Sequence, residues 1–339
     1  MTNSRSTIYD IANLAGNSAG TVSAVLNGTW QQRRISPATA EAIQHIADKL
    51  KYNVNRQASG LRKSRSGLIG MIIPIHDNRF FSAMSQTFER FARQRGLHPI
   101  VVSTLRDPAL EADTVKTMLS YQIDYLLVTG ATKPDEVSKL CKHHGVQHLN
   151  LDLPGSQAPS VVSDNYWGSQ KLTQEILRRS AIKKNIGRDA LYFLGGIESD
   201  YATSGRIRGF KDSVSKAHGP VTSAQINVCG YEAEPAHAAI KSLYQGLGGL
   251  PKGLFINSTQ PLEGVVRFLK TLPANELTKC TFGCYDWDPF ACFLSFPLLM
   301  VKQNTEELMR KAFELIDSGD LSGNAVFEIK PALVSSADY

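Results

Sequence analysis

Apolar residues near the amino terminus recur at helical spacing in two short segments, separated by a break at residues 14–16. The pattern predicts two helices with one face each to bury, defined by Ile8, Ile11, Ala12, Ala15, Val22, Val25 and Leu26. A third helix is predicted over residues 38–50, because Ser36 and Pro37 supply a helix start with proline at the first helical position. The first 52 residues therefore form a small all-α unit in this prediction.

The pattern changes at residue 68, where short apolar segments begin to alternate with amphipathic ones. Buried strands are predicted over residues 68–75, 98–104, 124–130, 146–153, 189–196, 253–258 and 281–286. Helices are predicted over residues 84–96, 109–121, 165–179 and 205–216. Such alternation indicates an α/β fold with parallel sheets, and this number of units is enough for two lobes.

The first two predicted helices have the layout of a helix-turn-helix, in which the second helix enters a groove of DNA. The outward positions of that second helix are small and polar. Ser18 suits its N-cap, where the hydroxyl satisfies one backbone donor and leaves neighbouring amides free for a phosphate. This segment is therefore a candidate DNA-binding motif.

The distribution of charge supports the same interpretation. Residues 1–66 contain nine Lys or Arg and only three acids, whereas the remaining 273 residues contain 28 of each sign. The whole net charge of +6 thus belongs to the first fifth of the chain. A basic unit attached to a neutral one is typical of a polyanion-binding module with a partner domain.

The composition limits the other classes of protein to which the chain can belong. A length of 339 residues with 42% hydrophobic residues suggests two or three globular units. The amino terminus lacks the apolar core of a signal peptide and no apolar run approaches a membrane span, so we expect a cytoplasmic protein without a membrane partner. The five cysteines are scattered, and Cys280, Cys284 and Cys292 fit no zinc template, so we expect structural thiols, no metal and no cofactor.

Several segments, taken in order along the chain, resemble the lactose-repressor (LacI/GalR) family of bacterial transcription regulators. After the helix-turn-helix come residues 52–56 (YNVNR) and Leu61, then 78–81 (NRFF), 151–152, 164–165, 206–210, 285–286 and 302–303. The resemblance covers essentially the whole chain. It implies an allosteric regulator, expected to be a repressor of carbohydrate-use genes, that binds a pseudo-palindromic double-stranded DNA operator as a homodimer.

The resemblance also implies the domain organisation. Residues 1–52 are expected to form the headpiece, 53–66 a hinge helix and linker, and 67–339 the effector-binding and dimerisation core. The core is expected to be periplasmic-binding-protein-like, with one lobe at about 67–165 and 304–326 and the other at about 166–303 and 327–339. We expect a dimer rather than a tetramer, because no heptad pattern follows the last predicted strand in this sequence.

The implied DNA contacts lie in the helix-turn-helix and the hinge. Thr7, Tyr9, Ser18, Asn27 and Asn55 match positions that hold the DNA backbone or the hinge in relatives. Arg56 is expected to pair with phosphate and Leu61 to act as an apolar wedge in the minor groove, and Ala58 is a further expected contact of the hinge. Leu61 packed against the headpiece is the alternative.

The recognition helix departs from the family pattern. Relatives carry long base-reading side chains where this chain has Ala19, Gly20 and Ala24, although Thr21 and Ser23 can still make polar contacts. Either the helix approaches the groove closely and reads thymine methyls and shape, or the hinge supplies most of the specificity. We prefer the second interpretation.

The effector is expected between the lobes, where polar groups bind vicinal hydroxyls and aromatic faces pack on a sugar ring. The implied residues are Phe80, Phe81, Asp152, Arg206, Tyr231, Asn257, Asp286, Trp287 and Gln303. Arg206 carries the most weight because a guanidinium fork suits hydroxyl pairs, carboxylates and phosphates. Core packing of the aromatic residues, a salt bridge of Arg206, and an exchange of roles between Tyr285 and Asp286 are the alternatives.

Other features favour the fructose and sucrose branch of the family, and hence a fructose-containing sugar or sugar phosphate. They are residues 31–36 (QQRRIS), 90–96 (RFARQRG), 231–236 (YEAEPA) and Asn257-Ser258. A non-sugar effector, or a two-lobed sugar-binding protein with weakened DNA reading, stays open. An enzyme is disfavoured because neither phosphate-loop pattern occurs, and a transport protein because the basic headpiece is present.

Overall fold

The computed structural model describes residues 6–52, 65–180 and 190–336, and the chain divides into two compact units, Met1–Ser66 and Gly67–Tyr339. In the first unit, α1 (Ile8–Ala15), α2 (Ala19–Leu26) and α3 (Pro37–Lys49) confirm the predicted three-helix headpiece. Their buried faces meet around Ile11, Val22 and Ile43, whose side chains are inaccessible to solvent.

Side-chain caps set the ends of these short helices. Thr7 and Asp10 form a capping box at the start of α1, and Gly16, with φ of 63°, ends that helix in the left-handed conformation. Ser18 caps α2 as predicted, because its Oγ accepts a hydrogen bond from the Thr21 amide at 3.1 Å. The Gly16 turn and the Ser18 cap together produce the helix-turn-helix.

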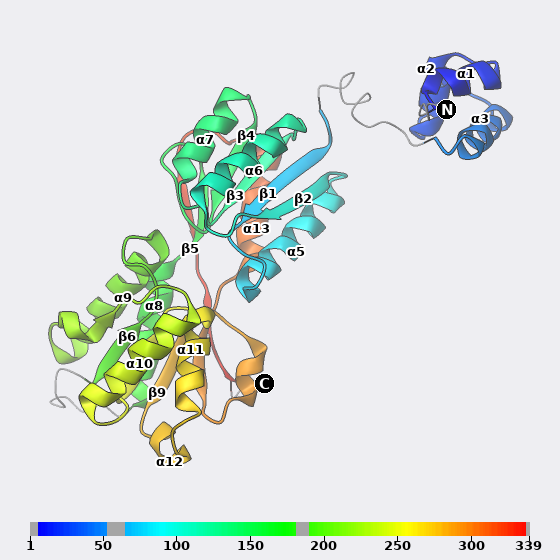
Figure 1. Cartoon of the computed structure of the whole chain (residues 1–339). Helices are drawn as coiled ribbons and strands as arrows, with labels where there is room; N and C mark the ends of the chain where they lie inside the picture. Colours follow the sequence, from blue (N-terminus) through cyan, green and yellow to red (C-terminus); the bar gives the residue numbers. More distant parts are fainter. Residues whose placement is uncertain (1–5, 53–64, 181–189, 337–339) are drawn as a thin grey trace. The chain divides into compact units, whose positions relative to one another are not determined.

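The second unit contains two six-stranded sheets, each covered by helices on both faces (Figure 1). The first lobe has the strand order β11-β5-β4-β3-β1-β2, and all five pairings are parallel. These strands are β1 (Leu68–Ile73), β2 (His98–Ser103), β3 (Tyr125–Thr129), β4 (Gln147–Leu151), β5 (Ser160–Ser163) and β11 (Val326–Ile329). Helices α5 (Arg79–Gln94) and α13 (Thr305–Ser318) pack on one face, and α6 (Pro108–Ser120) and α7 (Pro134–His143) on the other.

The second lobe repeats this arrangement in the order β12-β10-β9-β8-β6-β7, with only β12 antiparallel to its neighbour. Its strands are β6 (Leu191–Leu194), β7 (Ile226–Asn227), β8 (Gly253–Ile256), β9 (Thr281–Tyr285), β10 (Leu298–Lys302) and β12 (Ala332–Ser335). Helices α8 (Asn165–Arg179) and α9 (Tyr201–His218) cover one face, and α10 (Ala233–Leu247) and α11 (Thr259–Leu269) the other. The short helices η1 (Ser223–Gln225), α12 (Ala274–Leu277) and η2 (Pro289–Phe293) complete this lobe. The fold class predicted from the alternating pattern is confirmed.

Three connections join the lobes: β5 to α8, β10 to α13, and β11 to β12 (Figure 1). The last crossing follows Ile329 rather than residue 326, because Val326–Ile329 pairs along its whole length with β5 of the first lobe. The carboxyl ends of the parallel strands carry the loops from which both lobes contribute to one cleft.

Two helices begin earlier than their apolar periodicity predicted. α5 begins at Arg79 rather than near residue 84, because the Asn78 side chain accepts hydrogen bonds from the Phe80 and Phe81 amides. α9 begins at Tyr201 rather than at residue 205, because Asp200 caps the Thr203 amide at 2.6 Å. Both caps are Asn or Asp residues that also face the cleft. No helix in the described part of the chain has both the length and the apolar character to cross a membrane.

Candidate ligand-binding site and nucleic-acid interface

The headpiece presents an exposed face around the start of its first two helices. Tyr9 is 63% exposed, and Thr7, Ser18, Gly20 and Asn27 are also exposed. Ala19, Thr21 and Ser23 are partly buried. The predicted contact residues of α1 and α2 are thus accessible to a partner, with one exception.

Ala24 does not belong to that face, because its side chain is only 4% exposed. The loop after α2 folds back over this position, where the Ala24 carbonyl accepts hydrogen bonds from the Thr29 amide at 2.9 Å and from the Thr29 hydroxyl. The buried position 24 is therefore not available to DNA, and the outer surface of α2 lacks long side chains at Ala19 and Gly20.

Gly20 has free space beside it. A Cβ added there would meet only the Ser18 hydroxyl, at an ordinary 3.6 Å, so nothing within the described headpiece requires glycine at this position. The exposed basic residues Arg33, Arg34, Lys49 and Lys51 form no ion pair with any described residue, and their charges are available to a polyanion. The predicted hinge contacts Asn55, Arg56, Ala58 and Leu61 lie outside the described residues.

The core contains a tight pocket between its lobes. Seven of the predicted effector residues line it: Phe80, Phe81, Asp152, Arg206, Tyr231, Asp286 and Gln303. Its volume of about 30 Å³ is enough for only about two water molecules. The lobes are thus closed around this inner pocket, and a ligand of sugar size requires them to separate.

Arg206 is the best-anchored group in the inner pocket. Its side chain is buried, and its guanidinium lies 3.8 Å from the centroid of the Tyr285 ring. The Nε donates to the Asn165 side chain at 2.9 Å and Nη1 to the Asn257 carbonyl at 2.7 Å. Both acceptors are neutral, so the positive charge of Arg206 acts on the carboxylates of the cleft. The partnership with Tyr285 leaves Asp286, not Tyr285, to face the pocket.

Two pocket aspartates have unusual backbone conformations. Asp152 follows β4 with φ of 69°, and Asp286 follows β9 with φ of 102°, both in the region that L residues rarely adopt. Such strain costs on the order of 1–3 kcal/mol and concentrates at functional sites. It turns both side chains into the cleft instead of along their strands.

Burial governs the ionisation of these two residues. It raises the pKa of the Asp152 carboxyl to about 7, although Arg206 and Arg106 act in the opposite direction. Burial also raises the pKa of Asp286, against the opposing charge of Arg206 and a hydrogen bond that Gln303 donates at 2.5 Å. Both aspartates are acceptors suited to the hydroxyls of a ligand.

The inner pocket also includes residues that were not among the predicted effector residues, namely Asn78, Arg106, Leu153, Asp200, Ala202, Ser258 and Gln260. Asp200 accepts a hydrogen bond from the Tyr231 hydroxyl, which also lies 3.0 Å from the Thr203 hydroxyl. The Arg106 guanidinium lies 4.8 Å from the centroid of the Tyr231 ring, and so joins the two lobes. Asn78 and Asp200 could have been found as N-cap signals, whereas Arg106 gives no local signal.

Two predicted effector residues do not line the pocket. Asn257 is completely buried behind it, where its carbonyl holds Arg206 and its Nδ2 donates to Thr203 at 3.4 Å. Trp287 packs at the edge of the second-lobe core, with the Lys302 ammonium 4.0 Å from its ring centroid. Asn257 is thus a positioning residue in this closed form, and Trp287 lies beside the cleft.

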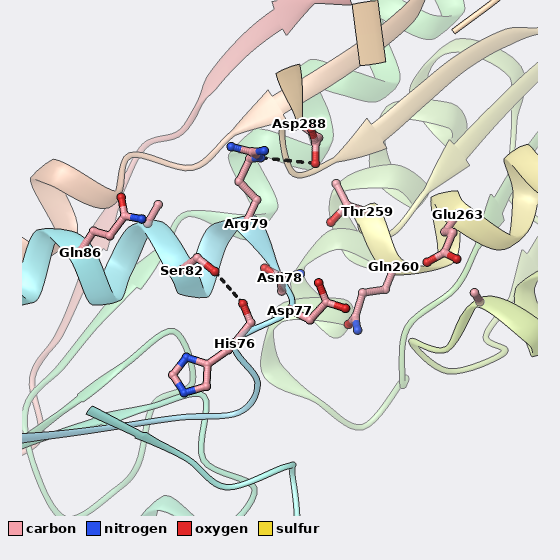
Figure 2. A pocket seen from close by; sticks show the side chains of 12 residues that line it. His76, Asp77, Asn78, Arg79, Ser82, Gln86, Thr259, Gln260, Glu263 and Asp288 are labelled. Atoms are coloured by element: carbon pink, nitrogen blue, oxygen red, sulfur yellow. Dashed lines mark hydrogen bonds and ion pairs between the residues drawn. The ribbon is translucent and has the colours of Figure 1, made fainter. Parts of the chain in front are cut away.

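A second, larger cavity of about 450 Å³ adjoins the inner pocket and shares Asn78 and Gln260 with it. Figure 2 shows its side chains coming from the start of α5 in one lobe and from the start of α11 and Asp288 in the other. Arg79 reaches across it to an ion pair with Asp288 at 3.4 Å. This outer cavity gives the inner pocket a polar entrance. No group of metal-ligating side chains occurs among the described residues.

Comparison with known proteins agrees with this architecture. Residues 7–55 match the model of the bacterial regulatory proteins of the lacI family, and residues 66–252 that of periplasmic binding proteins and the sugar-binding domain of the LacI family. The second match covers more than half of the chain. The chain belongs to the LacI family of bacterial regulatory proteins.

Individual relatives extend the likeness. The ribitol operon repressor of Klebsiella aerogenes is 53% identical over 191 residues, covering 56% of this chain and 70% of that protein. The sucrose operon repressor of Klebsiella pneumoniae is 29% identical over 319 residues, covering 93% and 92%. A solved structure of the lac repressor dimer, bound to operator and the anti-inducer ONPF, has a TM-score of 0.77 at 19% identity and 98% coverage of both chains. This last match supports the fold.

Proposed function

We propose that this protein is a cytoplasmic transcriptional repressor of genes for the use of a sugar or polyol. It binds a pseudo-palindromic operator as a homodimer through the headpiece and residues 53–66, and a small polyhydroxylated effector in the inner pocket controls that binding. The observation that carries the proposal is the pairing of a helix-turn-helix with a cleft that combines Arg206, Asp152 and Asp286. It functions without enzymatic activity, metal or cofactor.

The charges of the inner pocket favour a neutral effector over a sugar phosphate. Three carboxyl groups, of Asp152, Asp200 and Asp286, face two guanidinium groups, of Arg106 and Arg206, so the pocket has no excess of positive charge even when Asp152 is protonated. Carboxylates accept hydrogen bonds from vicinal hydroxyls but repel a phosphate. The names of two relatives, repressors of ribitol and sucrose operons, fit the same class of neutral polyhydroxylated compound. We therefore rank ribitol and other pentitols first and fructose-containing sugars second.

The direct test measures DNA binding and ligand response together. Fluorescence anisotropy with the upstream region of the protein's own operon is expected to show binding that weakens steeply with salt. Ribitol, D-fructose, sucrose and fructose 1-phosphate are then titrated into the complex, with thermal shift of the free protein in parallel. A footprint without a protected pseudo-palindrome at low salt would contradict the regulator, whereas the absence of any ligand effect would contradict only the effector class.

One alternative is supported by a specific observation. Because Ala19 and Gly20 leave the surface of α2 without base-reading side chains, the chain could instead be a sugar-responsive protein whose DNA reading is weak. The two functions differ in the ratio of affinity for the operator to affinity for unrelated DNA. A ratio near one, with intact ligand binding, would favour the alternative.

The Gly20→Ala variant separates the two modes of DNA reading. The substitution is expected to stabilise the headpiece by up to about 1 kcal/mol, because alanine favours the helix and the structure offers space for its Cβ. If residues 53–66 supply most of the specificity, operator affinity changes less than about twofold. A loss of tenfold or more would show that the helix backbone approaches the groove closely. Circular dichroism melting measures the stability of the headpiece, and fluorescence anisotropy measures the affinity for the operator.

A further inference from the structure

The amino-terminal turn of α11 lies between the inner pocket and the outer cavity. Ser258 and Gln260 line the inner pocket, while Thr259, Gln260 and Glu263 line the outer cavity, and Figure 2 shows the last three on the first turns of this helix. The predicted effector residues did not include this turn, although Ser258 belongs to the Asn257-Ser258 pair that favours the fructose and sucrose branch. Its hydrogen-bonding groups nevertheless face the place where a ligand would lie.

Several hydrogen-bonding groups in the first turn of α11 have no partner among the described residues. Ser258 occupies the N-cap position but makes no capping bond, and its hydroxyl, on a residue only 3% exposed, has no hydrogen-bond partner among the described residues. The Thr259 and Gln260 amides likewise donate to no described group, and Pro261 has no amide hydrogen. A buried polar group without a partner costs about 1–3 kcal/mol, so a ligand atom that satisfies it gains correspondingly.

The neighbouring helix starts in the cleft differ in this respect. Asn78 caps α5 by accepting from two amides, and Asp200 caps α9 by accepting from the Thr203 amide. Directly before Ser258, the buried Asn257 Oδ1 is also without a partner. Among the described residues, hydrogen-bonding groups without a partner therefore occur together at residues 257–260, at the inner pocket or directly behind it.

We propose that Ser258 and the free amides of Thr259 and Gln260 form an oxygen-binding subsite, which holds a hydroxyl at one end of the effector. A helix amino terminus carries partial positive charge and favours an electron-rich oxygen, and the Ser258 hydroxyl serves as donor or acceptor. The subsite is a specificity determinant. It complements the carboxylates of Asp152 and Asp286, which accept from the remaining hydroxyls. This inference rests on the proposed ligand-responsive function and names one contact within it.

The test uses the full-length protein with Ser258→Asp and Ser258→Ala. The aspartate carboxylate is expected to cap α11 itself, and so to raise the melting temperature of the ligand-free protein while occupying the subsite. Affinity for ribitol or D-fructose, whichever binds the wild type, is expected to fall about tenfold or more in Ser258→Asp and about fivefold in Ser258→Ala. A merely structural role for Ser258 would let Ser258→Asp raise stability without loss of affinity.

Lys133→Asp is the matched control. Lys133 is the N-cap of α7, makes no capping bond and lines neither the inner pocket nor the outer cavity. This variant is expected to leave ligand affinity unchanged, as measured by isothermal titration calorimetry. The inference is overturned if Ser258→Asp binds the ligand as tightly as wild type, or if it fails to raise the melting temperature of the ligand-free protein.

The second of these outcomes needs no ligand, so the subsite is tested even if no compound in the panel binds. Failure of the whole panel would count against the proposed effector class alone. Fructose 1-phosphate forms the charged arm of the experiment. If the subsite takes the uncharged hydroxyl, D-fructose binds the wild type more tightly than its phosphate ester. The assignment to a hydroxyl would be overturned if fructose 1-phosphate bound the wild type more tightly than D-fructose and if Ser258→Asp abolished that binding.

Discussion

The two lobes of the core place different chemistry at equivalent positions around the cleft. β4 and β9 hold the same place in their sheets, and each is followed by an aspartate with positive φ, Asp152 or Asp286. Asp286 accepts a hydrogen bond from Gln303, whereas no described group donates a hydrogen bond to the Asp152 carboxylate. The edge strands β2 and β7 are likewise followed by Arg106 in one lobe and Tyr231 in the other.

The two lobes contribute unequally to the site. In the second lobe, Arg206 lies over Tyr285 and donates hydrogen bonds to Asn165 and Asn257. Asp286 accepts a hydrogen bond from Gln303, so the charged groups of this lobe are held in place before a ligand binds. The first lobe contributes Asp152, whose carboxylate accepts no hydrogen bond from a described residue and is available to a ligand. We therefore expect the ligand to bind the second lobe first and the first lobe to close over it, which is how binding would bias the arrangement of the lobes.

Among the substitutions that test the difference between the lobes, Arg206→Ala is expected to have the largest effect on ligand affinity. Removal of the guanidinium leaves the Asn257 carbonyl without its buried donor and Asp286 without a nearby opposite charge, which costs about 3–5 kcal/mol. Ligand affinity is expected to fall more than about 100-fold and the melting temperature to decrease. Arg208→Ala, at an exposed position on the same helix, is the control and should change neither quantity. Retained ligand binding in Arg206→Ala would refute the preformed second-lobe site.

The two aspartates can be compared through the pH dependence of stability. Because the Asp152 pKa is about 7 in the folded protein, against about 4 for an unperturbed aspartate, the folded state holds its proton more tightly, and the free energy of unfolding falls as pH rises from about 4 to 7. Asp152→Asn removes this loss, so its advantage over wild type should grow to on the order of 3–4 kcal/mol above pH 7. Urea unfolding at pH 5 and pH 8 measures it.

The Asp286→Asn variant tests the second aspartate in the same way. This substitution deprives Arg206 of a nearby opposite charge, so we expect lower stability than wild type at both pH values. The asymmetry of the lobes would be wrong if the two variants shifted stability in the same direction at pH 8. For ligand binding, the ionised Asp152 is the better acceptor, so wild-type affinity is expected to increase between pH 6 and pH 8.

The smallest expected effect concerns the contact between the lobes. Arg106→Ala removes the cation–π contact with Tyr231, worth about 0.5–2 kcal/mol, and should weaken ligand binding about threefold to tenfold. Lys116→Ala, at an exposed position on α6, should leave it unchanged. Small-angle scattering with saturating ligand then reports lobe closure. A variant that closes and binds like wild type would show that Arg106 is not part of the closing contact.

Much of the fold could be predicted from local pattern. The helices of the headpiece and the start of α8 at Asn165 matched, because caps and apolar spacing act over a few residues. The starts of α5 and α9 were missed, since the capping Asn78 and Asp200 also serve the cleft and lie outside the apolar periodicity. Periodicity also does not predict that the Ala24 side chain is buried.

The cleft was less predictable than the fold. Its charged residues followed from resemblance, but Arg106 comes from a loop whose left-handed φ of 58° turns it toward Tyr231, and no local rule predicts that contact. Asn257 was expected to contact the ligand and instead lies behind Arg206. Its role depends on a hydrogen bond between residues 51 positions apart.

The class of each unit, the basic headpiece and the candidate acidic and basic residues follow from the amino-acid order. These features depend on apolar spacing, helix caps and charge, which act over short stretches of chain. The tertiary structure alone decided which of those groups share a cleft, which are already satisfied and which wait for a ligand. Hydrogen bonding and burial between distant segments set that distinction, as Asp286, Asp152 and Ser258 show. Chain order does not reveal whether a buried polar group has a partner.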